Sequence, residues 1–159
     1  METRTVRDSG DIEQVVAIIN AVHPDDPIGA VDFVAWGEQA IERLDLVAER
    51  DGAIVGAARS YVESQRPNPW LHIWVPPEER RRGVGSALFD EASGWAAGRG
   101  HSGFEAWVRA DSDASLAFAA AHGFEETGRE YGLVLDLTAG DPPAVEAPEG
   151  IELTTWAER

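Results

Sequence analysis

The chain has 159 residues, no cysteine, and a formal net charge of −16 from 29 acidic and 13 basic residues. This length suits one compact domain, and the missing cysteine excludes disulfides, thiolate metal sites and a cysteine nucleophile. The negative charge disfavours nucleic acid and anionic membranes as partners and suits a cationic one, although acidity also serves solubility alone.

The N-terminus and the histidines narrow the class of protein further. Residues 1–4 are polar and begin no apolar signal segment. No apolar run approaches the length that crosses a bilayer. The four histidines are far apart and lack metal-ligand spacing. We therefore expect a cytoplasmic protein without membrane association and without a metal site.

The first half of the chain predicts a strand, two helices and a hairpin. Asp11 and Gln14 resemble the capping box that opens a helix, and Asp51-Gly52 is a strong turn signal between two extended segments. In chain order, we expect a strand at residues 3–7, a helix from Asp11 to the segment 23–27, a helix at 31–44, and strands at 44–50 and 53–62.

The second half alternates strands with helices. In chain order, we expect a strand at residues 70–75, a helix from about Gly83 to Gly98, a strand at 103–109, a helix capped by Asp111 or Ser112 and closed by Gly123, and two strands within 124–137. Helical crossovers join parallel strands, whereas a hairpin is antiparallel. The sequence therefore predicts an α/β domain over residues 1–137, with a mixed, partly parallel, twisted sheet flanked by helices.

The last residues differ in composition from the rest. Residues 138–150 contain three Pro, two Gly and three acidic residues, which is typical of a linker. Residues 151–159 alternate as residues 3–7 do. Two interpretations stay open for them: the start of a second repeat in a tandem protein, or a C-terminal strand that packs on the same sheet or on a partner chain.

The most informative segment runs from Val75 to Leu88. A predicted strand ends there, three arginines follow at 80–82, and Gly83 and Gly85 open an amphipathic helix. The first N–H groups of a helix lack internal partners and carry positive partial charge, and glycines let an anion approach them closely. The segment predicts a pyrophosphate-binding loop. The alternative is an ordinary helix start with solvated arginines.

The spacing of this loop excludes two other phosphate-binding motifs. Arg82-Gly83 stands where a Walker loop needs Gly-Lys followed by Ser or Thr. Leu88 stands where a dinucleotide fingerprint needs Gly or Ala. A phosphate-binding module unrelated to coenzyme A stays as an alternative that rests on the loop alone.

The loop resembles the signature of the GNAT acetyltransferase superfamily. Arg80-x-x-Gly83-x-Gly85 is similar to the family's Arg/Gln-x-x-Gly-x-Gly/Ala motif, its lead-in Val75-x-Pro77 is similar as well, and so is the helix that closes in Gly123-Phe124. The resemblance covers about residues 3–137. It implies a GNAT fold with acetyl-CoA as cosubstrate, in which the strand before the loop pairs with the pantetheine arm and the loop amides hold the pyrophosphate.

Carried over residue by residue, the resemblance implies three groups of cofactor contacts. The strand contacts to pantetheine are Ile73, Trp74 and Val75. The loop contacts to pyrophosphate are Arg80, Arg81, Arg82, Gly83, Val84, Gly85 and Ser86. Near the far end of the cofactor lie Ser112, which replaces a usual asparagine, and Ser115.

The catalytic groups are less clearly marked. Many family members place a tyrosine five residues before the closing phenylalanine to protonate the leaving thiolate, and Ala119 stands there. We expect Tyr131 as the nearest alternative acid and His72 as the base candidate. Core or rim packing is the alternative for Tyr131, and a hydrogen bond between strands is the alternative for His72. Glu63 and Glu105 are strand carboxylates that face either the acceptor or solvent.

The tryptophans add a possible acceptor pocket. Six are present, and three of them either line a pocket that holds a cation by π contact or pack in the core: Trp70, Trp74 and Trp107.

These residues predict an N-acetyltransferase that moves an acetyl group from acetyl-CoA by direct attack to a primary amine of a small acceptor, for which a cation and a neutral molecule both stay open. The alternative is a non-catalytic acetyl-CoA-binding or structural half of a tandem protein, which the missing tyrosine and the linker favour. The expected partners are the small amine and either a second copy of the chain or a tandem second domain.

Overall fold

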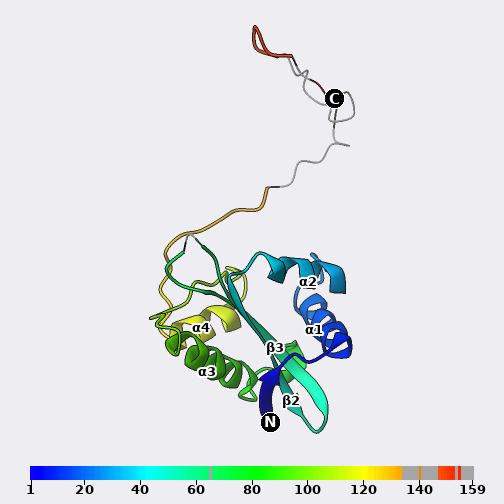
Figure 1. The fold of residues 1–159 in the computed structure, drawn as a ribbon, viewed down its shortest axis with the longest axis vertical. Coiled ribbons are helices and arrows are strands. Elements are labelled where there is room, and N and C mark those ends of the chain that lie inside the picture. The colour runs from blue at the N-terminus through cyan, green and yellow to red at the C-terminus, as the bar shows by residue number, and fades with distance from the viewer. Residues whose placement is uncertain (65, 134–139, 141–146, 153, 155–159) are drawn as a thin grey trace. The chain divides into compact units, whose positions relative to one another are not determined.

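The computed structural model describes residues 1–64, 66–133, 140, 147–152 and 154. It contains two compact units, residues 1–117 and 118–159. The first unit holds all four strands of the sheet and the helices that cover it (Figure 1). Within the described ranges, no helix is long and apolar enough to span a bilayer, and no three His, Asp or Glu side chains converge as metal ligands.

The sheet has four antiparallel strands in sequential order. They are β1 (Glu2–Thr5), β2 (Glu42–Arg50), β3 (Ala53–Val62) and β4 (Trp70–Trp74). The predicted hairpin between β2 and β3 is confirmed. Its turn residues Asp51 and Gly52 both have positive φ, 53° and 80°, as the tight hairpin turns that match strand twist require.

Among the described residues, parallel pairing occurs at one position. The predicted strand at 103–109 is wrong in extent, because only Glu105 pairs, in a single parallel bridge with Trp70. The Glu105 N–H donates to the Pro69 carbonyl at 2.9 Å, and the Leu71 N–H donates to the Glu105 carbonyl at 2.8 Å. A strand-like sequence does not by itself form strand pairing, and none of the described residues after Glu105 pairs with β4.

The two strands predicted within 124–137 are also not observed. Residues 124–133 form no strand, and 134–137 lie outside the described residues. Tyr131 and Leu133 are 80% and 93% exposed, so no core forms there that would reward pairing. The predicted linker at 138–150 and the segment 151–159 fall largely outside the described residues, and they remain predictions.

Helix α1 (Ser9–Val22) begins one turn earlier than predicted. Its N-cap is Asp8, whose carboxylate accepts the N–H of Asp11 at 3.0 Å. Asp11 is therefore the third helical residue and not the cap, and Gln14 bonds to the Gly10 carbonyl instead. The predicted cap at Asp11 is therefore wrong, because the Asp11 carboxylate accepts hydrogen bonds from Arg4 and from the Arg7 N–H instead.

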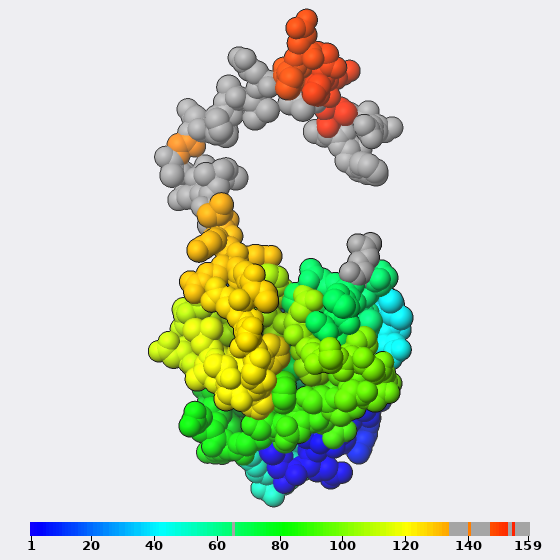
Figure 2. Space-filling model, turned by 90° about the vertical axis from the view of Figure 1, so that its left-hand side faces the viewer, coloured from blue at the N-terminus to red at the C-terminus, as the bar shows by residue number. Residues whose placement is uncertain are grey.

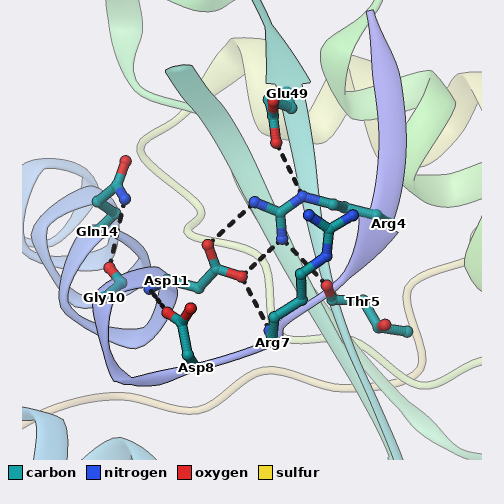
Figure 3. A network of polar contacts seen from close by, with 8 residues as sticks. All are labelled: Arg4, Thr5, Arg7, Asp8, Gly10, Asp11, Gln14 and Glu49. Carbon is teal, nitrogen blue, oxygen red and sulfur yellow. Dashed lines mark hydrogen bonds and ion pairs between the residues drawn. The ribbon is translucent and has the colours of Figure 1, made fainter. Parts of the chain in front are cut away.

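Asp11 joins the helix to the sheet through Arg4 (Figure 3). The Arg4 guanidinium donates to both Asp11 carboxylate oxygens, at 2.6 and 3.0 Å, and to Glu49 on β2 at 2.8 Å. The hydrogen bonds from Arg4 lower the pKa of the Asp11 carboxyl, and the Arg7 N–H adds a smaller effect. One guanidinium thus fixes β1, α1 and β2 to one another.

Helix α2 (Ala30–Glu38) is shorter than the predicted 31–44. Glu42 already begins β2, and Leu44 pairs with Ser60 of β3. The hairpin ladder therefore overrides the helical pattern beyond Gln39. Helices α1 and α2 lie against one face of the sheet, and their shared core contains Val15, Ile18, Ile19, Phe33, Val47, Ala57 and Trp74.

Helix α3 (Val84–Ala97) covers the opposite face of the sheet (Figure 1). Its buried residues repeat every four positions, as Val84, Leu88, Ala92 and Ala96. A Cβ on Gly56 of β3 would lie 2.5 Å from the Val84 side chain, so glycine lets helix and strand approach closely. Figure 2 shows the molecule from the side that faces left in Figure 1, where green residues form much of the surface and the blue N-terminal residues lie at the lower edge.

Candidate functional site

Beyond its bridge to Glu105, β4 has no pairing partner on that side among the described residues. Because the Leu71 N–H points to Glu105, away from β3, the main chain of Ile73 points to that same edge. Among the described residues, none continues the ladder beside Ile73. Trp74 differs, since its main chain faces Ala57 of β3. β4 and the segment after Glu105 therefore leave an edge that an extended ligand can pair with, at Ile73 more directly than at Trp74.

The segment between β4 and α3 reaches the helix through a short 3-10 turn, η1 (Pro77–Glu79). Pro76 and Pro77 end the strand, and the Arg80 guanidinium then donates to the Val75 carbonyl at 3.0 Å. Arg81 adopts the left-handed region at φ 62°, and Gly83 follows at φ 81°. Two left-handed residues turn the chain sharply into α3, and glycine takes the second position without strain.

The N-terminus of α3 has no internal cap. Gly83 is the N-cap residue and no side chain bonds to the first turn. The first helical bond runs from the Ala87 N–H to the Gly83 carbonyl. No described residue accepts a hydrogen bond from the N–H groups of Gly85 or Ser86. A Cβ built on Gly83 meets nothing within 4 Å, so the N-cap position itself is not crowded by other residues.

The arginines beside this turn provide positive charge in an acidic chain. Arg82 forms an ion pair with Glu79 at 3.3 Å, while Arg50 of β2 holds the other oxygen of the same carboxylate. No described acidic residue pairs with Arg81. Unpaired helix N–H groups, the helix dipole and nearby guanidinium groups together suit a pyrophosphate. The residues present therefore fit the cosubstrate that the sequence implies.

Ser112 and Ser115 come together at the start of α4 (Asp113–Ala121). Their hydroxyl oxygens lie 2.8 Å apart, and the Ser115 N–H donates to the Ser112 hydroxyl at 3.4 Å. Of the two predicted caps, Ser112 is therefore the one observed. Asp111 instead pairs with Arg109 at 2.7 Å.

His72 lies in the middle of β4 inside an aromatic cluster. Its ring stacks with Tyr61 and Trp74, at centroid distances of 5.9 and 5.6 Å, and meets the edge of Trp36 at 4.8 Å. Its Nε2 is buried and has no hydrogen-bond partner among the described residues. The interstrand hydrogen bond that was the alternative for this histidine is therefore not present at Nε2.

The surroundings of His72 keep its imidazole neutral. The pKa of His72 is lowered to about 4, mainly by burial and to a smaller extent by the charges of Arg59 and His23. Arg59 is the cross-strand partner of His72 and is only 1% exposed. It donates to Asp45 at 2.6 Å and to the Phe33 carbonyl at 2.7 Å. A neutral ring with an unpaired nitrogen can still exchange a hydrogen bond with a ligand.

A second group lies at the end of β4 beside His72. The Trp70 ring is 6.5 Å from the His72 ring and stacks on Trp107 at 5.8 Å. Glu63 accepts a hydrogen bond from the Trp70 indole at 3.2 Å, and Glu105 forms an ion pair with Arg66. Trp107 is 56% exposed. Of the three tryptophans singled out from the sequence, Trp70 and Trp74 are buried and Trp107 is exposed, where a ligand can reach it.

The predicted acid, Tyr131, belongs to the second unit and is 80% exposed. It does not lie on a strand, contrary to the prediction, and its role remains a proposal. Sequence reasoning missed Trp36, Arg59, Tyr61 and Arg66. Alternation along β3 places Arg59 and Tyr61 on one face, a signal that was available, whereas Trp36 and Arg66 come from elements whose packing no local pattern reveals.

Residues 19–124 match the model of the acetyltransferase (GNAT) family. The chain belongs to this family. It is 29% identical over 147 residues to mycothiol acetyltransferase from Nocardia farcinica, covering 92% of this chain and 46% of that protein. It is 35% identical over 113 residues to L-2,4-diaminobutyric acid acetyltransferase from the same organism, covering 67% of this chain and 55% of that protein.

Solved GNAT structures share this fold. A ribosomal-protein-alanine N-acetyltransferase from Brucella melitensis superposes with a TM-score of 0.68 and 28% identity, covering 80% of this chain and 86% of that one. The chain spans about half the length of the curated relatives it matches.

Proposed function

We propose that this chain transfers the acetyl group of acetyl-CoA to a primary amine of a small, positively charged acceptor. The observation that carries the proposal is the open N-terminus of α3 beside the unpaired edge of β4. The two places are joined by the turn at residues 75–83, so one extended ligand can use both. The name of one relative, a diaminobutyric acid acetyltransferase, supports an amine acceptor.

In this proposal the main chain binds and orients the cosubstrate. The N–H groups of Gly85 and Ser86, with Arg81 and Arg82 nearby, hold the pyrophosphate. Ile73 pairs with the pantetheine arm as an added strand would. These contacts hold the thioester at the end of β4 near His72, where the amine approaches it in the geometry required for attack.

The acetyl group is transferred by direct attack of the amine on the thioester. The amine nitrogen attacks the thioester carbonyl, the C–N bond forms, the C–S bond breaks, and CoA leaves as a thiolate. The nitrogen loses one proton to Nε2 of His72 or to water, and the thiolate gains one from Tyr131 or water. Because its pKa is about 4, His72 is available as an acceptor at neutral pH but is a weak base. General bases work best near the operating pH.

Steady-state kinetics on variants assigns these roles. His72→Gln keeps the side-chain size and removes the basic nitrogen, and we expect kcat to fall about 10²-fold, the lower end for general acid–base catalysis, with acetyl-CoA affinity unchanged. Tyr131→Phe removes one hydroxyl, and a tenfold drop in kcat supports it as the acid. An unchanged kcat in either variant removes that residue from the reaction.

The alternative function is a non-catalytic acetyl-CoA-binding unit. Ala119 at the usual tyrosine position favours it, as does the match to half of longer relatives. Release of free thiol from acetyl-CoA, measured with a panel of mono- and diamines, separates the two. Turnover with any amine supports the enzyme, while tight acetyl-CoA binding without turnover supports the alternative.

A further inference from the structure

A positively charged side chain of the protein occupies a place built to hold a cation. The Arg66 guanidinium carbon lies 4.8 Å from the centre of the Trp70 ring. Its nitrogens form ion pairs with Glu105 and, at 3.7 Å, with Glu63. An aromatic face flanked by two carboxylates is an arrangement that attracts ammonium and guanidinium groups. We call Glu63, Trp70 and Glu105 the rim site.

Trp70, Glu63 and the main chain of Glu105 have hydrogen bonds that do not involve Arg66. The Trp70 indole N–H donates to Glu63, and Trp70 itself is 8% exposed on β4. The main chain of Glu105 is bonded on both sides, to Pro69 and to Leu71. Arg66, by contrast, follows β3 in a loop, and its side chain is 45% exposed. Exposed ion pairs contribute little free energy, so little stability is lost when a ligand cation displaces the Arg66 side chain.

The rim site lies next to the proposed reaction centre. Trp70 is two residues from His72 on the same face of β4, with ring centres 6.5 Å apart. Glu105 forms the bridge at which β4 and the following segment begin to separate. A ligand bound at the rim site therefore extends toward His72 and the open edge of β4 with only a few bonds between its two ends.

We propose that Arg66 is a resident occupant of the rim site and that a doubly cationic acceptor displaces it. The amine that attacks a thioester must be neutral, so it cannot supply the charge that this site recognises. The acceptor therefore carries a second ammonium or guanidinium group, which lies on Trp70 between Glu63 and Glu105. The substrate class is a short diamine or an amino-guanidine. The identity of the reacting end rests on the proposed function, whereas binding at the rim site does not.

Calorimetry with 1,3-diaminopropane and with uncharged 1-propanol, in the absence of acetyl-CoA, tests the proposal. Arg66→Gln removes the competitor, and we expect diaminopropane to bind about fivefold more tightly, while 1-propanol, which carries no charge, is unaffected. Glu105→Gln removes one carboxylate, and we expect diaminopropane to bind at least about fivefold more weakly. Thermal melting verifies that each variant is folded.

Arg99→Gln is the matched control. Arg99 also stacks on a tryptophan, Trp95, with its guanidinium carbon at 4.5 Å, and it pairs with a single carboxylate, Glu42. Its removal changes net charge by the same amount and should leave diamine binding unchanged. An equal gain in both arginine variants would show a general charge effect and overturn the proposal.

The remaining outcomes are equally decisive. Unchanged or weaker diamine binding in folded Arg66→Gln means that Arg66 only ties its loop to β4, and overturns the proposal. Binding unaffected by Glu105→Gln, or no binding to either the wild type or Arg66→Gln, overturns it as well. Failure of acetyl transfer appears instead as absent thiol release, which leaves these binding results intact.

Discussion

Helices α1 and α3 both contain 14 residues and both pack on the sheet, yet their N-termini are built in opposite ways. In α1, the Asp8 carboxylate accepts the Asp11 N–H, and Asp11 supplies a negative charge within the first turn. In α3, Gly83 offers no side chain, the first turn has no acidic residue, and arginines precede it.

The comparison separates a structural helix end from a binding one. Both helices present unpaired N–H groups and a positive end of the dipole. In α1, the Asp11 N–H donates to the Asp8 carboxylate, while the Asp11 carboxylate binds Arg4 and so joins the helix to the sheet. The protein leaves the N–H groups of α3 unsatisfied, which costs stability unless water or a ligand anion binds there. An aspartate carboxylate in α1 thus occupies the position that we assign to a phosphate in α3.

The largest expected effect is a loss of acetyl-CoA affinity when α3 is given a capping carboxylate like that of α1. Gly83→Asp places a capping carboxylate at the N-cap of α3, and aspartate tolerates positive φ better than most residues. We expect acetyl-CoA affinity to fall more than about 100-fold, because the new carboxylate takes the donors and repels the pyrophosphate. Calorimetric titration measures the loss.

Gly94→Asp serves as its control on the same helix. A Cβ at Gly94 meets no atom within 4 Å, and the substitution adds the same charge far from the N-terminus. Acetyl-CoA affinity should stay within about twofold of wild type, since one distant exposed charge is largely screened. A comparable loss in both variants would point to net charge and not to the cap.

The second largest expected effect is a pH dependence of stability, which follows from the burial of His72 among aromatic side chains. Its folded pKa is about 4, below the usual 6.5, so between these values the unfolded chain binds a proton that the folded chain does not. Stability therefore falls as pH drops, by about 2 kcal/mol between pH 7 and pH 5. Urea unfolding at both pH values measures it.

His72→Gln should remove most of this pH dependence. His23 keeps a smaller part, because burial lowers its pKa too. A His72→Gln protein that loses as much stability as wild type between pH 7 and pH 5 would show that His72 is not buried in a neutral form.

The smallest effect concerns the structural helix end. Asp8→Ala removes the cap of α1 and should lower the free energy of unfolding by about 1 kcal/mol. Acetyl-CoA affinity should not change, because α1 has no part in the proposed binding site. Urea denaturation measures the free energy of unfolding, and calorimetry on the same sample measures acetyl-CoA affinity. A loss of affinity in Asp8→Ala would contradict the distinction between a structural helix end in α1 and a binding helix end in α3.

The sequence predicted those features whose signals are contiguous. The hairpin follows from Asp51-Gly52 between two extended runs, and the loop before α3 follows from arginines and glycines within a few residues. The predicted cap of α1, Asp11, lies three residues after the observed cap, Asp8, because the Asp11 carboxylate binds Arg4 across the sheet, a contact that no local pattern reveals.

Features that depend on distant partners could not be predicted in this way. Residues 103–109 and 124–133 have strand-like composition, but a strand needs an edge to pair with, and only Glu105 finds one among the residues described. The aromatic cluster around His72 contains Trp36 from α2, and Arg59 from β3 lies opposite His72. Arg66 pairs with Glu105, which lies 39 residues away in the sequence. Such contacts are set by packing and not by local periodicity.

The central claim is that the N–H groups opening α3 bind the pyrophosphate of acetyl-CoA. Nuclear magnetic resonance of ¹⁵N-labelled protein titrated with acetyl-CoA tests it directly. The account predicts that the amide signals of Gly85 and Ser86 move strongly and saturate together, while those of Gly10 and Asp11 at the capped end of α1 stay in place. Gly85 and Ser86 signals that do not move at saturating acetyl-CoA would contradict it.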